Sequence, residues 1–452
     1  MDVDIIKTES LGNRGYLIYD GTNAIAVDVQ RDYQRWIDTA EQAGAQITHV
    51  LETHIHNDYV TGGYALAKQT GAEYIVPTDT DISFEATKIS DGDEIKVGEL
   101  TIKAHHTPGH TPHHMSYQIS VPDHAPVVCT GGGLLYGTVG RPDLISKDMT
   151  KPLAEAQYDS AHKLKDAAPM ETHILPTHGF GSFCSSSPGT GADSSTLEQE
   201  IKLNIAFTSS DKRSFVDTIL AGLEPYPRYY AQMGPTNLKG PGPMKLQAAT
   251  DIDNTTLKKY IRSENTWTLD LRDRTKHADN TIEGAYGFEM SDSFATYVGW
   301  LMPWGNNIVL LADSEADLRE AQVQLGRIGM DIFVQQASII HPSVSASDDK
   351  QQLRHERFSS ITPDTVTQAK ILDVRSASEH KQAHIEGSIN IPFHDIQLRM
   401  NELNKDNEVW IHCASGYRAS IVASILHTHG YTVVLIDDDF KNVPLELLVT
   451  SQ

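Results

Sequence analysis

The chain has 452 residues, more than one hydrophobic core usually supports, so two or three domains are expected. Its hydrophobic content of 39%, charged content of 21% and formal net charge of −23 fit a globular protein and exclude nucleic acid or an anionic membrane surface as partners. No apolar run is long enough to span a bilayer. Three widely spaced cysteines and an acidic start without an apolar signal segment favour a reducing, cytoplasmic location.

The first half of the chain alternates strands and polar loops. Residues 16–30 predict two strands joined by a Gly/Asn turn, and residues 31–44 predict an amphipathic helix that ends at a glycine. Further apolar strands run into four loops that read "THIHND", "HTPGHT", "TGGG" and "PTHG". Because a rigid sheet aims the loops at its strand ends, we expect these four loops to converge on one site.

The loop at "THIHND" predicts a metal site, although its signature is incomplete. Tyr59 stands where a further histidine would complete the pattern His-x-His-x-Asp-His. Imidazole and carboxylate groups are suitable ligands for zinc and iron, but one His-x-His pair alone is a weak signal. The candidate metal ligands are His54, His56 and His110, with Asp58 and His178 as further donors.

Two stretches predict linkers. Residues 234–245 are rich in Gly and Pro, and residues 341–352 are polar and rich in Ser and Asp. We therefore expect domains over residues 1–245, 246–345 and 355–452.

The two later domains repeat each other. The motif "LDLRD" at Leu269 matches "LDVRS" at Leu372, which is 103 positions further on, and "IEGAYGF" matches "IEGSINI" at the same spacing. A repeat of this length predicts a duplicated domain rather than a solenoid unit. The first copy has Ala312 where the second has Cys413, so only the second copy retains the chemistry.

Cys413 is the candidate nucleophile of the second copy. The segment "EVWIHCASGYRASIVASILHTHG" predicts a strand, a short loop and a helix, so Cys413 lies where backbone N–H groups and the helix dipole favour a thiolate. Gly416 relieves the curvature of the loop, and Arg418 is placed to hold an anionic substrate or a persulfide. The alternative, a buried structural cysteine, does not explain Gly416 and Arg418.

These motifs resemble those of two known families. "LDVR", "HIEGSINIP" and "HCASGYR" resemble a rhodanese domain, whose Cys-to-Arg loop is one residue shorter than that of the cysteine phosphatases. The loops "THIHND", "HTPGHT", "GRPDL" and "PTHG" resemble the metallo-β-lactamase superfamily. The resemblance implies an α/β multidomain chain, with a metallo-β-lactamase αββα sandwich followed by two rhodanese-like domains.

The order of these domains resembles that of bacterial persulfide dioxygenase–sulfurtransferase fusions of the staphylococcal type. In that family an iron(II) ion is held by two histidines, which map to His54 and His110, and by an aspartate that maps to Gly132. The usual carboxylate ligand is therefore missing, and three states are open: iron(II), zinc(II), or no metal. Asp58 is the candidate replacement carboxylate.

The implied function is a rhodanese-type sulfurtransferase joined to an altered persulfide dioxygenase-type domain, acting on a low-molecular-weight thiol persulfide or thiosulfate. One alternative is a zinc-dependent thioester hydrolase of the glyoxalase II type fused to a sulfurtransferase. A second alternative is a non-enzymatic sulfur-carrier scaffold. The identity of the thiol carrier and the oligomeric state, including a homo-oligomer, are open at this point. Cys129 is expected to be a core residue, whereas Cys184 follows His178 closely and has two interpretations, packing, which is favoured, and an approach to the pocket.

Overall fold

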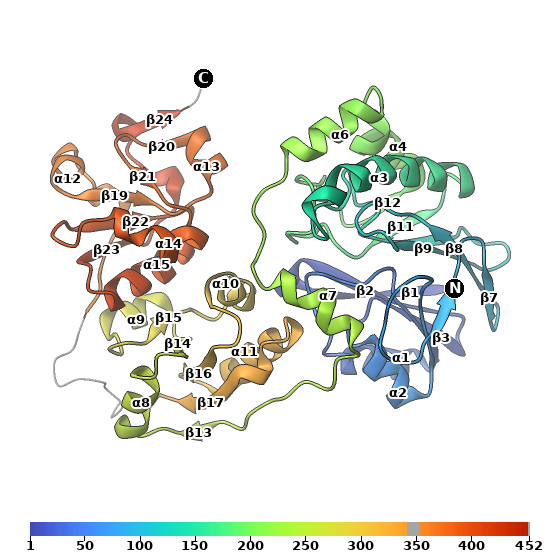
Figure 1. Ribbon diagram of the computed structural model, residues 1–452, viewed down its shortest axis with the longest axis horizontal. Helices are drawn as coiled ribbons and strands as arrows, with labels where there is room; N and C mark the ends of the chain where they lie inside the picture. Colours follow the sequence, from blue (N-terminus) through green and yellow to red (C-terminus); the bar gives the residue numbers. More distant parts are fainter. Residues whose placement is uncertain (341–351, 451–452) are drawn as a thin grey trace. The chain divides into compact units, whose positions relative to one another are not determined.

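The computed structural model describes residues 1–340 and 352–450, which form two compact units (Figure 1). Unit 1 comprises Met1–Lys245 and Val323–Asp331, and unit 2 comprises Leu246–Gln322 and Ile332–Gln452. The predicted linker over residues 341–352 lies outside the described residues except for Gln352. Among the described helices none is long and apolar enough to cross a membrane.

Unit 1 contains two six-stranded sheets. The first sheet has the strand order β1-β2-β3-β4-β5-β6, and its strands are β1 (Asp2–Thr8), β2 (Asn13–Tyr19), β3 (Asn23–Val27), β4 (Gln46–Leu51), β5 (Glu73–Pro77) and β6 (Thr87–Ile89). The second has the order β12-β11-β10-β9-β8-β7, and its strands are β7 (Glu94–Val97), β8 (Leu100–His106), β9 (Met115–Ser120), β10 (Val127–Gly131), β11 (His173–Pro176) and β12 (Ser195–Thr196).

The two sheets of unit 1 pack face to face, and helices cover both outer faces. Ile18 and Leu51 from the first sheet and Ile102 and Tyr117 from the second share one fully buried core cluster. The helices of unit 1 are α1 (Gln34–Ala43), α2 (Gly63–Thr70), α3 (Lys147–Ala167), α4 (Leu197–Leu203), α5 (Ile205–Thr208), α6 (Lys212–Ala221) and α7 (Tyr230–Leu238). The predicted αββα sandwich is confirmed.

Each outer helix packs an apolar face against one of the two sheets. Trp36 of α1 and Leu66 of α2 are buried against the first sheet, whereas Ala161 of α3 and Phe215 of α6 are buried over the second. Helix α1 ends at Gly44, which adopts a left-handed conformation at its C-cap, as the sequence predicts. This packing fixes the strand ends from which the functional loops emerge.

The linker predicted over residues 234–245 is partly wrong, because helix α7 continues to Leu238. Gly234 and Pro235 are poor helix formers, yet Met233 and Asn237 are buried and bind the helix to unit 1. Tertiary contacts therefore override the local preference of this segment.

Unit 2 contains two five-stranded sheets and a two-stranded one. The first sheet has the order β13-β17-β16-β14-β15, from β13 (Thr250–Asp251), β14 (Thr266–Asp270), β15 (Tyr286–Gly287), β16 (Asn307–Ala312) and β17 (Val334–Ile339). The second has the order β18-β23-β22-β19-β21, from β18 (Arg354–Glu356), β19 (Lys370–Asp373), β21 (Ile389–Asn390), β22 (Val409–His412) and β23 (Val433–Ile436). Strands β20 (Ala383–Ile385) and β24 (Leu448–Thr450) pair separately.

The two larger sheets of unit 2 have equivalent topologies, with parallel strands in the same relative order. The helices around them are α8 (Asn254–Ile261), α9 (Arg274–Asp279), α10 (Phe294–Leu301), α11 (Glu315–Arg327), α12 (Pro363–Gln368), α13 (Ala377–Gln382), α14 (Ile396–Arg399) and α15 (Tyr417–Thr428). The boundary between the two units runs through α11. The predicted domain limits within residues 246–452 remain a prediction.

The two copies also share a buried ion cluster at the end of an equivalent strand. In the first copy Asp270 accepts hydrogen bonds from Arg272 at 2.6 Å and pairs with His277 at 2.8 Å. In the second copy Asp373 accepts from Arg375 at 2.6 Å and pairs with His380 at 2.9 Å. This correspondence of side chains supports the duplication that the repeated motifs predict.

Candidate functional site

The predicted site of unit 1 lies where five strands end. Strand β4 leads into His54 and His56, β8 leads toward His110, β10 leads into Gly132, and β11 leads into His178. Strand β3 leads into Asp28, which lies beside them. The structure therefore brings together the loops that the sequence predicts to converge, and these side chains are all buried.

The imidazoles of His54 and His110 each have one nitrogen held by a neighbour. His54 Nδ1 is 2.9 Å from Thr53 Oγ1, and this hydroxyl donates its own proton to Asp28 at 2.7 Å, so Nδ1 is the donor. His110 Nδ1 donates to the backbone carbonyl of Arg141 at 2.8 Å. In both rings the Nε2 atom is left with its lone pair, which is the form that binds a metal.

His178 is oriented in the same way. Its Nδ1 lies 3.0 Å from the Asn13 side-chain oxygen and 3.2 Å from Asp58 Oδ2, both of them acceptors. Although burial acts to raise the pKa of Asp58, its contacts with the His178 ring and the Asn13 amide hold this pKa well below its usual range. Asp58 thus acts as an orienting carboxylate for His178, and its Oδ1 has no hydrogen-bond partner within residues 1–340 and 352–450.

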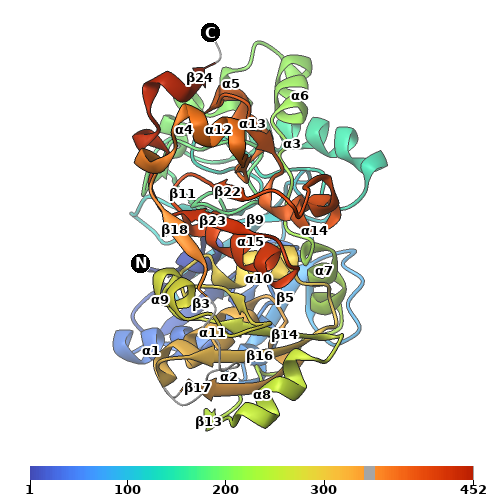
Figure 2. The same cartoon turned by 90° about the vertical axis from the view of Figure 1, so that its left-hand side faces the viewer.

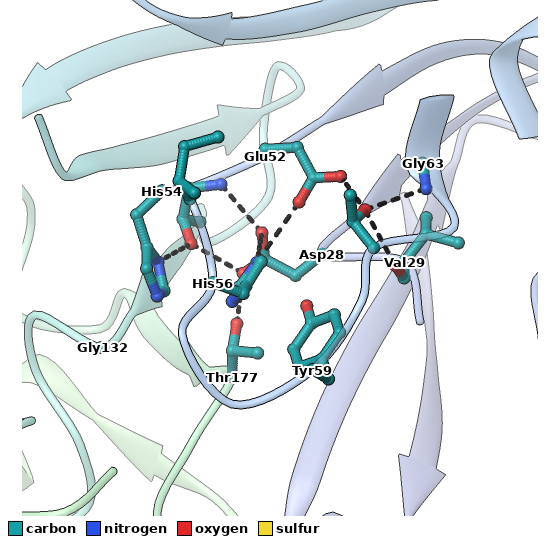
Figure 3. A network of polar contacts seen from close by, with 12 residues as sticks. Asp28, Val29, Glu52, His54, His56, Tyr59, Gly63, Gly132 and Thr177 are labelled. Carbon is teal, nitrogen blue, oxygen red and sulfur yellow. Dashed lines mark hydrogen bonds and ion pairs between the residues drawn. The ribbon is translucent and has the colours of Figure 1, made fainter. Parts of the chain in front are cut away.

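His56 belongs to a different cluster, although it was predicted as a ligand. Its Nε2 lies 3.2 Å from Asp28 Oδ1 and 3.3 Å from Glu52 Oε2, and Tyr59 stacks on its ring (Figure 3). Burial alone would lower the pKa of His56, but the two carboxylates raise it to about 10. A protonated imidazole cannot donate a lone pair to a metal. His56 is close enough to His54 and His178 to share a metal with them, so its role as a ligand stays a prediction.

Gly132 stands where the resemblance predicts an aspartate, and the space for a side chain there is filled. A Cβ atom at Gly132 would lie 2.2 Å from Cδ2 of His110. The Gly132 N–H donates to His114 Nε2 at 3.1 Å, and burial lowers the pKa of His114 to about 3, so this imidazole is neutral. A carboxylate at this position would require His110 to move.

Cys184, which was expected to be a packing residue, lies in the site. The Sγ atom and one nitrogen each of His110 and His178 lie within 4.8 Å of one another. Cys184 is fully buried, and burial raises the pKa of its thiol. The closeness of Cys184 to His178 in the sequence left this approach open, but the contact itself depends on how the loop after β11 folds back over the site.

Asn237 of α7 is a positioning residue that sequence reasoning missed. Its side-chain N–H group donates to the carbonyls of His56 and Tyr59, each at 2.9 Å, and its oxygen accepts from the Thr61 N–H at 2.9 Å. Asn237 therefore clamps the histidine loop through three backbone contacts. The sequence analysis missed Asn237 because it lies in a stretch rich in Gly and Pro that was predicted to be a linker.

The donor set of unit 1 does not fit the iron site that the resemblance implied. A mononuclear iron(II) dioxygenase site uses two histidines and one carboxylate. Here Gly132 supplies no carboxylate, and Asp58 is engaged by Asn13 and His178. One nitrogen each of His110 and His178 lies near the Cys184 sulfur, and nitrogen and sulfur donors suit a borderline or soft cation.

The candidate site of unit 2 is the loop between β22 and α15. Cys413 follows the strand directly and is buried, and Gly416 is the N-cap residue of α15 with φ of 92°. A Cβ atom at Gly416 would lie 2.2 Å from Asp437 Oδ1, so this tight loop requires glycine. The predicted strand–loop–helix arrangement is therefore present.

Arg418 does not stand as a free cation beside Cys413. Its two terminal nitrogens donate to Glu379 at 2.7 and 2.9 Å, which is a bidentate ion pair. Burial acts to lower the pKa of Arg418, but Glu379 and Cys413 raise it. The predicted role of Arg418 in holding an anionic substrate stays a prediction, and Glu379 offsets part of the charge that this role needs.

The first copy of the repeat borders the Cys413 loop. The hydroxyl of Tyr417 donates to the Glu289 carbonyl at 2.7 Å, and the ring of Tyr297 in α10 lies 5.4 Å from that of Tyr417. Figure 2 shows α10 beside α15. Burial raises the pKa of Tyr297, which also interacts electrostatically with Arg418 and Cys413. The copy without the cysteine therefore forms part of the surroundings of the other copy's loop.

Comparison with known families agrees with this geometry. Residues 12–179 match the metallo-β-lactamase superfamily, and residues 360–443 match the rhodanese-like domain. The chain is a metallo-β-lactamase domain fused to a C-terminal rhodanese-like domain. The first copy of the repeat lies outside both matched ranges, so its assignment as a rhodanese-like domain stays a prediction.

Individual relatives resemble different parts of this fusion. A metallo-β-lactamase structure from Staphylococcus aureus has a TM-score of 0.67 at 26% identity, covering 75% of this chain and 99% of that one. The mitochondrial persulfide dioxygenase ETHE1 of Bos taurus is 28% identical over 199 residues, which are 43% of this chain and 71% of that protein. Hydroxyacylglutathione hydrolase of Rhizobium etli is 32% identical over 120 residues, which are 26% of this chain and 46% of that protein. The chain thus spans about half the length of this hydrolase.

Proposed function

We propose that this protein is a sulfurtransferase that handles persulfide sulfur at Cys413, joined to a persulfide dioxygenase-type domain whose iron site is altered. The observation that carries the proposal is the position of Cys413 directly after β22. Four residues separate it from Arg418, and one of them, Gly416, allows the tight turn into α15. Similarity of the first domain to a persulfide dioxygenase supports the same class of substrate.

The proposed reaction has two steps at one sulfur atom. The Cys413 thiolate attacks the outer sulfur of thiosulfate or of a thiol persulfide, the S–S bond of the donor breaks, and sulfite or the free thiolate leaves. The resulting persulfide on Cys413 is then attacked at its outer sulfur by a nucleophilic acceptor, and the Cys413 thiolate is restored. The N-terminus of α15 and the loop N–H groups favour the anionic form of both species.

A cysteine-to-serine substitution tests this assignment. We expect Cys413→Ser to reduce sulfur transfer from thiosulfate to cyanide to background, because a hydroxyl cannot carry sulfane sulfur. Cys129→Ala, which alters a cysteine in the buried strand β10, is the matched control and should retain activity. Thiocyanate formation measures both variants. Full activity of Cys413→Ser would assign the transfer to another residue.

A further inference from the structure

We propose that Arg274, in the copy of the repeat without the cysteine, is a positioning residue for the Cys413 loop of the other copy. Its guanidinium holds and neutralises Asp437, the carboxylate that lies against Gly416, so that a dianionic sulfur donor can approach the loop. This inference rests on the proposed sulfur transfer at Cys413 and gives the first copy a part in it.

The first argument is the position of Asp437. This residue follows β23 directly, and β23 pairs with β22, the strand that leads into Cys413. The carboxylate of Asp437 lies so close to Gly416 that no Cβ atom fits at that position. Gly416 is the N-cap residue of α15, where the helix dipole favours an anion. Asp437 therefore places a negative charge at the helix end that is expected to favour the Cys413 thiolate.

The second argument is the origin of the cation that pairs with Asp437. The nearby Asp439 pairs with Lys441 of its own copy at 2.7 Å. Asp437 pairs instead with Arg274 of the first copy, whose Nε atom donates to Asp437 Oδ1 at 2.7 Å. The position that matches Arg274 at the spacing of 103 is Ala377, so the second copy has no equivalent arginine. The charge beside the Cys413 loop is thus offset from outside its own copy.

The third argument is that the same segment of the first copy holds the loop at a second point. Arg274 Nη1 donates to Glu289 Oε2 at 2.7 Å, and the backbone carbonyl of Glu289 accepts from the Tyr417 hydroxyl at 2.7 Å. Tyr417 directly follows Gly416. Burial acts to lower the pKa of Arg274, but Asp437 and Glu289 raise it, so the guanidinium keeps its charge. The loop is therefore held through both Asp437 and Tyr417.

The fourth argument is the charge of the group. Arg274, Asp437 and Glu289 together carry one negative charge, and loss of Arg274 would leave two. Their side chains are only 17% to 28% exposed, so solvent screens these charges less than at an open surface. Thiosulfate carries two negative charges, so an added negative charge beside the loop repels it twice as strongly as it repels a monoanion.

Removal of Arg274 tests this role against a control of equal charge. We expect Arg274→Gln to lower kcat/KM for thiosulfate by about threefold to tenfold, and for a monoanionic thiosulfonate by only about twofold to threefold, because the repulsion scales with the charge of the donor. Lys276→Gln removes the same charge from the same helix, where Lys276 pairs with the exposed Asp313. This control should leave both values unchanged. A purely structural defect would lower the two values equally.

Removal of the carboxylate gives the reciprocal test. Arg274→Gln combined with Asp437→Asn has the net charge of the parent, and its kcat/KM for thiosulfate should return to within about twofold of the parent value. Asp437→Asn alone should raise kcat/KM by up to about threefold, because one carboxylate fewer faces the loop. Circular dichroism checks that each variant folds.

Four results would overturn the role of Arg274: equal losses with both donors, an equal loss in Lys276→Gln, no recovery in the double variant, or a fall in Asp437→Asn alone. The last of these decides even where Arg274→Gln does not fold. A parent that forms no thiocyanate from thiosulfate would instead contradict the proposed transfer at Cys413, and the role of Arg274 would fall with it.

Discussion

At the residue scale, the charge around Cys413 is set by a pair rather than by one cation. Arg418 lies in the first turn of α15, and Glu379 of α13 accepts two of its hydrogen bonds. Both side chains are partly exposed, so solvent screens the pair. Glu379 therefore limits how strongly the loop attracts a dianionic donor such as thiosulfate.

Removing the charge of Glu379 should strengthen thiosulfate binding. We expect Glu379→Gln to lower the KM for thiosulfate by about threefold to tenfold, because it frees the charge of Arg418 while the glutamine can still cap α13. Glu386→Gln removes an exposed carboxylate from the same domain and is the matched control. Steady-state kinetics at constant ionic strength measure the effect. An equal change in both variants would contradict a specific role for Glu379.

His412 should make the stability of unit 2 depend on pH. This residue is fully buried beside Cys413, and burial lowers its pKa to about 4, against about 6.5 in an unfolded chain. The folded state therefore binds fewer protons between these values, and stability is lost as pH falls from about 6.5 to about 4, by up to about 3 kcal/mol. Urea unfolding at several pH values should show this loss in the parent and a smaller one in His412→Asn. If the free energy of unfolding depended on pH equally in the parent and in His412→Asn, another group would be responsible.

At the element scale, the short helix α7 holds the histidine loop of unit 1. The side chain of Asn237 makes three hydrogen bonds to the backbone between His56 and Thr61. Helix α7 lies outside the two sheets, yet its hydrogen bonds fix the loop that begins directly after β4. A segment with an apparent linker composition is therefore part of the site.

Loss of this clamp should loosen the loop. We expect Asn237→Ala to lower the free energy of unfolding of unit 1 by about 1–3 kcal/mol, since three buried backbone groups lose their partner. Amide hydrogen exchange should accelerate over residues 54–61. Gln232→Ala on the same helix is the control and should have little effect on that exchange. Unchanged protection in Asn237→Ala would mean that other contacts hold the loop.

At the scale of the whole molecule, the elements were easier to predict from the sequence than the contacts between their loops. The apolar runs before His54 and Cys413 predicted β4 and β22, and the glycines predicted the helix ends. The sequence favoured packing for Cys184 over an approach to the pocket, because Cys184 and His110 are distant in sequence and meet only through the packing of two loops. The Arg418–Glu379 pair was missed for the same reason, since a motif shows residue types but not their partners.

The whole molecule combines two sulfur-containing centres that lie in separate units. Unit 1 holds the histidines with Cys184, and unit 2 holds Cys413 in its strand-to-helix loop. Of these two centres, only the Cys413 loop lies next to a helix N-terminus, an arrangement that stabilises a thiolate. The account therefore depends on Cys413 as the residue that carries transferred sulfur.

Intact-protein mass spectrometry of the full chain after brief incubation with thiosulfate tests this claim most directly. The account predicts a mass increase of one sulfur atom, located on Cys413 by peptide mapping and removed by cyanide. Cys129→Ala should show the same increase, and Cys413→Ser should show none. Added sulfur on Cys184 or Cys129 alone, or an unchanged mass in a parent that still turns over thiosulfate, would contradict the account.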